Sequence, residues 1–174
     1  MISESVQNNK AGIAVGLFFA CLLISIVINA DNLREELPLI IFYVVLLVNT
    51  FFSIRLFARF IPKNNMVQNS IDTALALFYI ILAFSIRSVS FFTFVLFFFF
   101  LVATTKYILL RTIVHEPRLL RRKILINSLT AFMAVVALVG IQTGWSRQTA
   151  WSLVTVFSLA NIVFLAIIPM YRLD

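Results

Sequence analysis

Six long stretches of this 174-residue chain are apolar and nearly free of charge. The hydrocarbon core of a bilayer is about 30 Å thick, and a helix needs roughly 20 apolar residues to cross it. In addition, 62% of the residues are hydrophobic, which exceeds the content of typical soluble domains. The sequence therefore predicts an all-α, polytopic integral membrane protein with six transmembrane helices, at approximately residues 11–30, 37–58, 67–86, 88–110, 124–142 and 149–170.

Six crossings of this length use nearly all of residues 1–174, so we expect one transmembrane helical domain and no separate soluble domain. The segments between the apolar stretches are short. Short connections make consecutive helices antiparallel neighbours. The predicted architecture is therefore three antiparallel helical hairpins.

The distribution of basic residues predicts the orientation of these helices. If residue 1 is cytoplasmic, the outer turns hold only Arg34, Arg87 and Arg147. The other eleven of the 14 Lys and Arg residues then fall in cytoplasmic segments: Lys10, Arg55, Arg59, Lys63, Lys106, Arg111, Arg118, Arg121, Arg122, Lys123 and Arg172. Basic residues concentrate on the cytoplasmic side of membrane proteins. We therefore expect a multi-pass cell-membrane protein with both termini in the cytoplasm, and we interpret the net charge of +7 as orientation signal and contact with anionic lipid rather than nucleic-acid binding.

Polar residues within the spans gather in the cytoplasmic half under this topology. Intramembrane polar residues are costly and often mark functional sites. The predicted set is Asn49 and Ser53, Asp72 and Thr73, Thr104, Thr105 and Lys106, Asn127 and Thr130, and Ser158 and Asn161. Two interpretations stay open. Asp72, Asn49, Thr104, Thr105, Asn127 and Asn161 either line an inward-facing ligand or ion pocket, or such side chains form hydrogen bonds between and within helices.

Asp72 is the acidic residue most deeply placed in a predicted span. The charge-free stretch that follows it, residues 73–86, is too short to cross a bilayer, so the helix must begin before Asp72. A carboxylate at that depth needs a cation, and Arg55 and Arg59 lie across the adjoining turn. We expect an ion pair with one of them, which either fixes the hairpin or forms part of a cation-sensing or transport site.

Two further patterns predict contact surfaces. Gly12, Gly16 and Ala20 recur every four residues, and so do Gly140 and Gly144, a spacing typical of close helix packing. The basic segment 111–123 connects two predicted spans and contains Arg118, Arg121, Arg122 and Lys123. We expect these four side chains to contact anionic lipid or a cytoplasmic partner.

Nothing in the sequence indicates catalysis. The chain has no Gly-x-Ser-x-Gly, His-Glu-x-x-His or glycine-rich phosphate motif, and one His and one Cys do not make a metal site. We expect no cofactor and no metal. The leading hypothesis is a non-enzymatic subunit of a membrane transport or signalling assembly, as a homo-oligomer or with another membrane subunit. The alternative is an ion channel or small-solute carrier with its polar pocket around Asp72.

Overall fold

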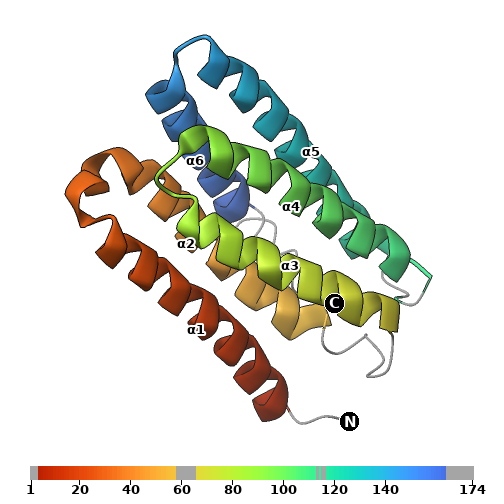
Figure 1. The fold of residues 1–174 in the computed structure, drawn as a ribbon. Helices are drawn as coiled ribbons and strands as arrows, with labels where there is room; N and C mark the ends of the chain where they lie inside the picture. Colours follow the sequence, from red (N-terminus) through yellow and green to blue (C-terminus); the bar gives the residue numbers. More distant parts are fainter. Residues whose placement is uncertain (1–3, 58–65, 113, 115–116, 164–174) are drawn as a thin grey trace.

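The computed structural model describes residues 4–57, 66–112, 114 and 117–163, and these residues are almost entirely helical (Figure 1). The prediction of an all-α chain is confirmed for this part of the sequence. Its elements are α1 (Glu4–Ile28), the short 3-10 helix η1 (Ala30–Asn32), α2 (Leu33–Phe57), α3 (Met66–Phe84), α4 (Val89–Leu110), α5 (Pro117–Gln142) and α6 (Ser146–Ile162).

The helices run alongside one another, and the turns α1–α2, α3–α4 and α5–α6 lie at the same end of the bundle (Figure 1). We call this the turn end. We call the opposite end, where α2 and α4 finish and α3 and α5 begin, the basic end. Within each of the three predicted hairpins the two helices pack against each other, but the most extensive helix contact is between α4 and α5. The hairpins therefore pack against one another and do not form separate units.

Local sequence explains where several helices begin and end. Ser88 caps α4, because its hydroxyl accepts a hydrogen bond of 3.3 Å from the backbone N–H of Phe91. Gly144 ends the α5–α6 turn with a φ of +87°, a left-handed conformation that glycine adopts without steric cost. Pro117 opens α5, since proline lacks only a backbone donor that the first helical turn leaves unused.

Four helix starts differ from their predicted positions, and α2 begins at Leu33, about one turn before residue 37. α1 and α5 begin about two turns before residues 11 and 124, and α6 begins about one turn before residue 149. The prediction that segment 117–123 belongs to an interhelical connection is therefore wrong, because these residues form the first turns of α5. The end predicted for the last helix, residue 170, lies outside the described residues.

The core is apolar and strongly aromatic. Phe42 of α2 stacks on Phe157 of α6 with ring centroids 4.3 Å apart, and Phe18 of α1 stacks on Tyr79 of α3 at 4.5 Å. Tyr43 of α2 is fully buried, and its hydroxyl donates a hydrogen bond of 3.0 Å to the backbone carbonyl of Tyr79. Such ring pairs stabilise the packing beyond the area they bury. These contacts join four helices in the middle of the bundle.

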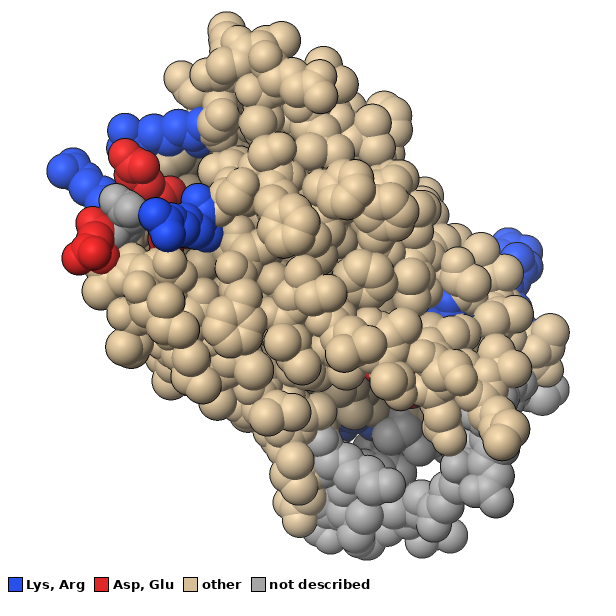
Figure 2. Space-filling view, in the orientation of Figure 1, with Lys and Arg blue, Asp and Glu red and all other residues tan. Residues whose placement is uncertain are grey.

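The outside of the bundle is also apolar. Large hydrophobic side chains are exposed on every helix, among them Ile13 at 73%, Val27 at 76% and Leu125 at 66%. On the face shown in Figure 2, charged residues lie at the two ends, and a broad uncharged zone separates them. Within the described residues, five helices, α1 to α5, are long and apolar enough to cross a membrane by length and composition. Apolar surface of this extent needs a non-aqueous neighbour.

Candidate functional site: a polar cluster at the basic end

One face of α2 carries hydrogen-bonding side chains near the basic end. The hydroxyls of Ser53 and Tyr107 are 2.7 Å apart, and both side chains are buried. One turn toward the centre, the Thr50 hydroxyl donates to the carbonyl of Leu46 and is also hydrogen-bonded to the hydroxyl of Tyr79. Residues three or four apart share a helix face, so a single face of α2 is joined to α3 and to α4.

The same face of α2 is joined to α5 through Lys123. Its ammonium donates a hydrogen bond of 2.9 Å to Asn49 Oδ1 and lies 5.8 Å from the ring centroid of Tyr107. The Lys123 side chain is only 3% exposed. Burying an ammonium is costly unless polar groups replace its water, and the amide oxygen and the aromatic ring do this in part.

These bonds connect helices whose backbones do not pack closely. In the described part of the chain, the backbone of α2 lies close to those of α1 and α6 and farther from those of α3, α4 and α5, which α2 contacts through side chains. Long side chains from those three helices therefore bridge the space to α2. Tyr107 also belongs to a small apolar core near the basic end, in which Phe57 of α2 lies with its ring centroid 5.0 Å from that of Tyr107. The polar side chains therefore lie beside apolar packing at this end of the bundle.

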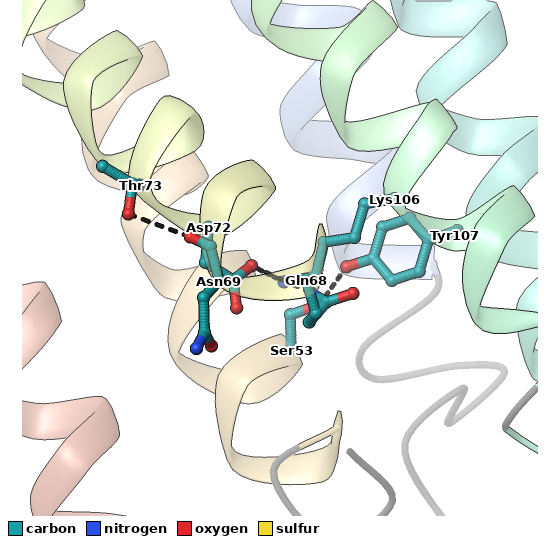
Figure 3. A network of polar contacts seen from close by, with 7 residues as sticks. All are labelled: Ser53, Gln68, Asn69, Asp72, Thr73, Lys106 and Tyr107. Carbon is teal, nitrogen blue, oxygen red and sulfur yellow. Dashed lines mark hydrogen bonds and ion pairs between the residues drawn. The ribbon is translucent and has the colours of Figure 1, made fainter. Parts of the chain in front are cut away.

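An ion pair lies beside this interior. Asp72 Oδ1 accepts from the Lys106 ammonium at 2.5 Å and from Gln68 Nε2 at 3.1 Å (Figure 3). The Lys106 side chain is 14% exposed and that of Asp72 is 45% exposed, so the pair sits at the edge of the bundle. Lys106 directly precedes Tyr107 on α4, and this adjacency places the ion pair next to the Ser53–Tyr107 bond, which Figure 3 also shows. We call Asn49, Ser53, Gln68, Asp72, Lys106, Tyr107 and Lys123 the polar cluster.

The partner of Asp72 differs from the expectation. Arg55 makes no ion pair with Asp72, and Arg59 lies outside the described residues. The cation comes instead from α4, because the backbone of α3 lies closer to that of α4 than to that of α2. Closeness in sequence to Arg55 and Arg59 therefore did not predict the partner of Asp72. The contact between α3 and α4 determines it.

The other residues of the expected pocket divide into two groups. The hydroxyls of Thr104 and Thr105 donate to the carbonyls of Phe100 and Leu101, and the Asn161 amide donates to the carbonyl of Phe157, so all three bond to their own helices. Asn127 is buried and lies four residues after Lys123, on the same face of α5. Asp72 and Asn49 therefore belong to the polar cluster, and Asn127 lies on the face of α5 that carries Lys123. The hydroxyls of the two threonines and the Asn161 amide instead form hydrogen bonds within their own helices.

The small residues of α1 face outward. A Cβ placed on Gly12 or Gly16 would meet nothing within 4 Å, and Ala20 is exposed. The expected close helix contact is therefore not made within the described chain.

The second pair of glycines behaves differently. A Cβ on Gly140 would come 2.8 Å from Oγ1 of Thr149, so α5 and α6 approach each other closely there. Gly144, by contrast, has open space around it and serves the turn through its positive φ. Only Gly140 contributes the expected close packing.

The four basic residues at the start of α5 differ in their exposure to solvent. Arg118, Arg121 and Arg122 are exposed, as expected for contact with lipid or a partner. Lys123 is buried and points inward, so the prediction that it contacts lipid or a cytoplasmic partner together with these arginines is wrong. The helical period could have revealed this, since Lys123 follows Leu119 and Leu120 at spacings of four and three, and both leucines are buried.

Sequence reasoning missed the tyrosines and one acid. The hydroxyls of Tyr79 and Tyr107 join α3 and α4 to α2, and neither residue is among the predicted polar set. Glu36, at the turn end, is 3% exposed, and neither carboxylate oxygen has a hydrogen-bond partner among the described residues. Arg87 interacts with it electrostatically.

The described residues contain no group of three or more His, Cys, Asp or Glu side chains placed to hold a metal ion. The cluster offers hydrogen-bond donors, one carboxylate and two ammonium groups, which suit the binding of a polar or charged group. No family model, curated protein or solved structure matches this chain.

Proposed function

We propose that this chain is a multi-pass membrane protein that acts without catalysis, as a subunit of a membrane transport or signalling assembly. The observation that supports this best is the distribution of polarity. The outside of the bundle is apolar between its two charged ends, and many interior polar side chains hydrogen-bond to other helices or to their own. Such a body is suited to packing within a bilayer.

We propose further that both termini face the cytoplasm and that the basic end lies at the anionic leaflet. The exposed side chains of Arg118, Arg121 and Arg122 support this, because basic residues at a helix end attract anionic lipid. The turn end would then face outward in a cell membrane. It carries both acidic and basic residues, among them Glu36 and Arg87.

Cysteine labelling tests the orientation. In a Cys21→Ser background, Asp31→Cys and Gln148→Cys should react with a membrane-impermeant thiol reagent on intact cells, and Arg121→Cys should react only after permeabilisation. Labelling of Arg121→Cys in intact cells would refute the orientation.

Assembly is tested by native co-purification in mild detergent. We expect a homo-oligomer or a defined membrane partner. Gly16→Leu should dissociate the complex without lowering the stability of the monomer, because a Cβ at Gly16 would meet nothing within 4 Å among the described residues. Leu17→Phe is the matched control, since it adds bulk at the next exposed position on a different face of α1. A wild-type protein that is monomeric and has no partner at native expression would contradict the proposal.

The polar cluster favours a second candidate function, an ion channel or small-solute carrier. The observation behind it is the buried Lys123, an ionisable group inside a largely apolar bundle, whose ammonium lies 5.8 Å from the ring centroid of Tyr107. Tyr107 directly follows Lys106, which pairs with Asp72. Purified protein in vesicles would then support flux, and Asp72→Asn would abolish flux while the protein stays folded. Wild-type protein that conducts nothing alone would favour the first candidate.

A further inference from the structure

Both tryptophans of the chain lie at the α5–α6 turn, at the turn end of the bundle (Figure 1). Trp145 directly precedes α6 and is 64% exposed, and Trp151 lies in the second turn of α6 and is 39% exposed. Tryptophan is strongly buried on average, so two exposed indole rings at one turn indicate a surface that does not face bulk water alone.

The character of the exposed surface changes at the level of these two residues. The exposed side chains nearest the tip of the turn are polar, namely Gln142, Thr143, Arg147 and Gln148. Further along both helices the large exposed side chains are apolar, among them Val136 and Val139 on α5 and Val156 and Leu159 on α6. The change from Gln142 to Val139, and from Gln148 to Trp151, takes less than one helical turn. A boundary of this kind matches the edge of a hydrocarbon layer.

The neighbours of α6 place this helix in the same layer as the candidate spans. Within the described residues, α6 is not among the five helices that are long and apolar enough to cross a membrane. It nevertheless packs against α2 and α5, which are among those five, and it runs beside α5 in the opposite direction (Figure 1). Its buried Phe157 stacks on Phe42 of α2. A helix that packs against two candidate spans in this way shares their surroundings.

We propose that Trp145 and Trp151 hold the α5–α6 turn in the phospholipid headgroup layer, so that α6 enters the bilayer within its first turns as a sixth membrane-embedded helix. Tryptophan is enriched at membrane–water boundaries, because its ring is apolar and its indole N–H donates to polar groups such as lipid ester carbonyls. The inference rests on the proposed membrane function and deepens it, since it names the lipid layer that this surface contacts.

The spacing of the two residues predicts a different depth for each. Trp151 follows Trp145 by six positions, which is about 9 Å along a helix that rises about 1.5 Å per residue. The headgroup layer on each side is about 5–8 Å thick, which is half the difference between about 40–45 Å for the whole bilayer and about 30 Å for its core. Trp145 therefore lies among the headgroups, and Trp151 lies at the edge of the hydrocarbon core.

Depth-dependent fluorescence quenching of the full-length protein in phosphatidylcholine vesicles tests this. Trp151→Phe leaves Trp145 as the only tryptophan, and Trp145→Phe leaves Trp151. Three quenchers are compared: iodide on both sides of the membrane, lipid brominated near the carbonyl end of its acyl chains, and lipid brominated near their methyl end. Trp145 should be quenched by iodide and by carbonyl-end bromine. Trp151 should lose most of its fluorescence to carbonyl-end bromine and little to iodide.

The control places a tryptophan at the middle of a candidate span. Leu129 of α5 is 57% exposed, so Leu129→Trp combined with Trp145→Phe and Trp151→Phe should be quenched mainly by methyl-end bromine. The inference is overturned if iodide alone quenches Trp145 and Trp151, or if methyl-end bromine quenches either of them as strongly as it quenches the control. If iodide quenches the control too, α5 is outside the hydrocarbon core, and the proposed membrane function fails together with the inference.

Discussion

Replacing Gly140 by Ala should destabilise the protein, although alanine is the better helix former. The new Cβ would lie 2.8 Å from Thr149 Oγ1, whereas atoms in ordinary contact are about 3.5–4.0 Å apart. Overpacking of this kind costs about 1–3 kcal/mol. The higher helix propensity of alanine relative to glycine offsets about 1 kcal/mol of this cost. The expected net loss in the free energy of unfolding is therefore about 0–2 kcal/mol, from the difference of these two effects.

The control is Gly16→Ala, because Gly16 also lies within a helix but its Cβ would meet nothing within 4 Å. Only the propensity effect remains there, and Gly16→Ala should stabilise by about 1 kcal/mol. The two variants should thus differ by about 1–3 kcal/mol, the cost of the contact with Thr149. Unfolding in detergent, followed by the loss of helical circular dichroism, measures both variants under identical conditions.

Thr149→Ala should rescue Gly140→Ala. It removes Oγ1 and Cγ2 and leaves only Cβ, which would be 3.9 Å from the new methyl group, an ordinary contact. The double variant should therefore be more stable than the sum of the single changes by about 1–3 kcal/mol, the cost of the contact that is relieved. This lies within the couplings of about 0.5–3 kcal/mol measured for residues in contact. If Gly140→Ala is as stable as Gly16→Ala, or if Thr149→Ala brings no rescue, the close contact between α5 and α6 is wrong.

Two further predictions concern the polar cluster. Asp72→Asn should lower stability by no more than about 1 kcal/mol, since the carboxylate is 45% exposed, and the exchange Asp72→Lys with Lys106→Asp should restore most of the loss in chemical unfolding. A loss of several kcal/mol would show that the pair is buried more deeply than the structure indicates. Tyr107→Phe should cost about 1–3 kcal/mol, because it leaves the buried Ser53 hydroxyl without its partner, while Tyr107→Phe combined with Ser53→Ala should cost less than the single change. Equal losses in the single and double variants, measured by thermal unfolding, would contradict this.

The sequence by itself determined the helical class and the approximate position of each helix. The reason is that spans of apolar residues have a length set by the bilayer and are separated by short polar or charged segments, so this information is local. It also indicated that Asp72 lies within a helix and needs a cation, because the charge-free stretch after it is too short.

Only the tertiary structure decided which side chains meet. Asp72 pairs with Lys106 because α3 packs against α4, and Lys123 turns inward because its face of α5 is the one that packs. Nearly every surface of an apolar helix has a similar composition, so composition cannot tell a face that meets lipid from one that meets another helix. For the same reason Gly16 and Gly140 look alike in sequence, yet one faces outward and the other lies against Thr149.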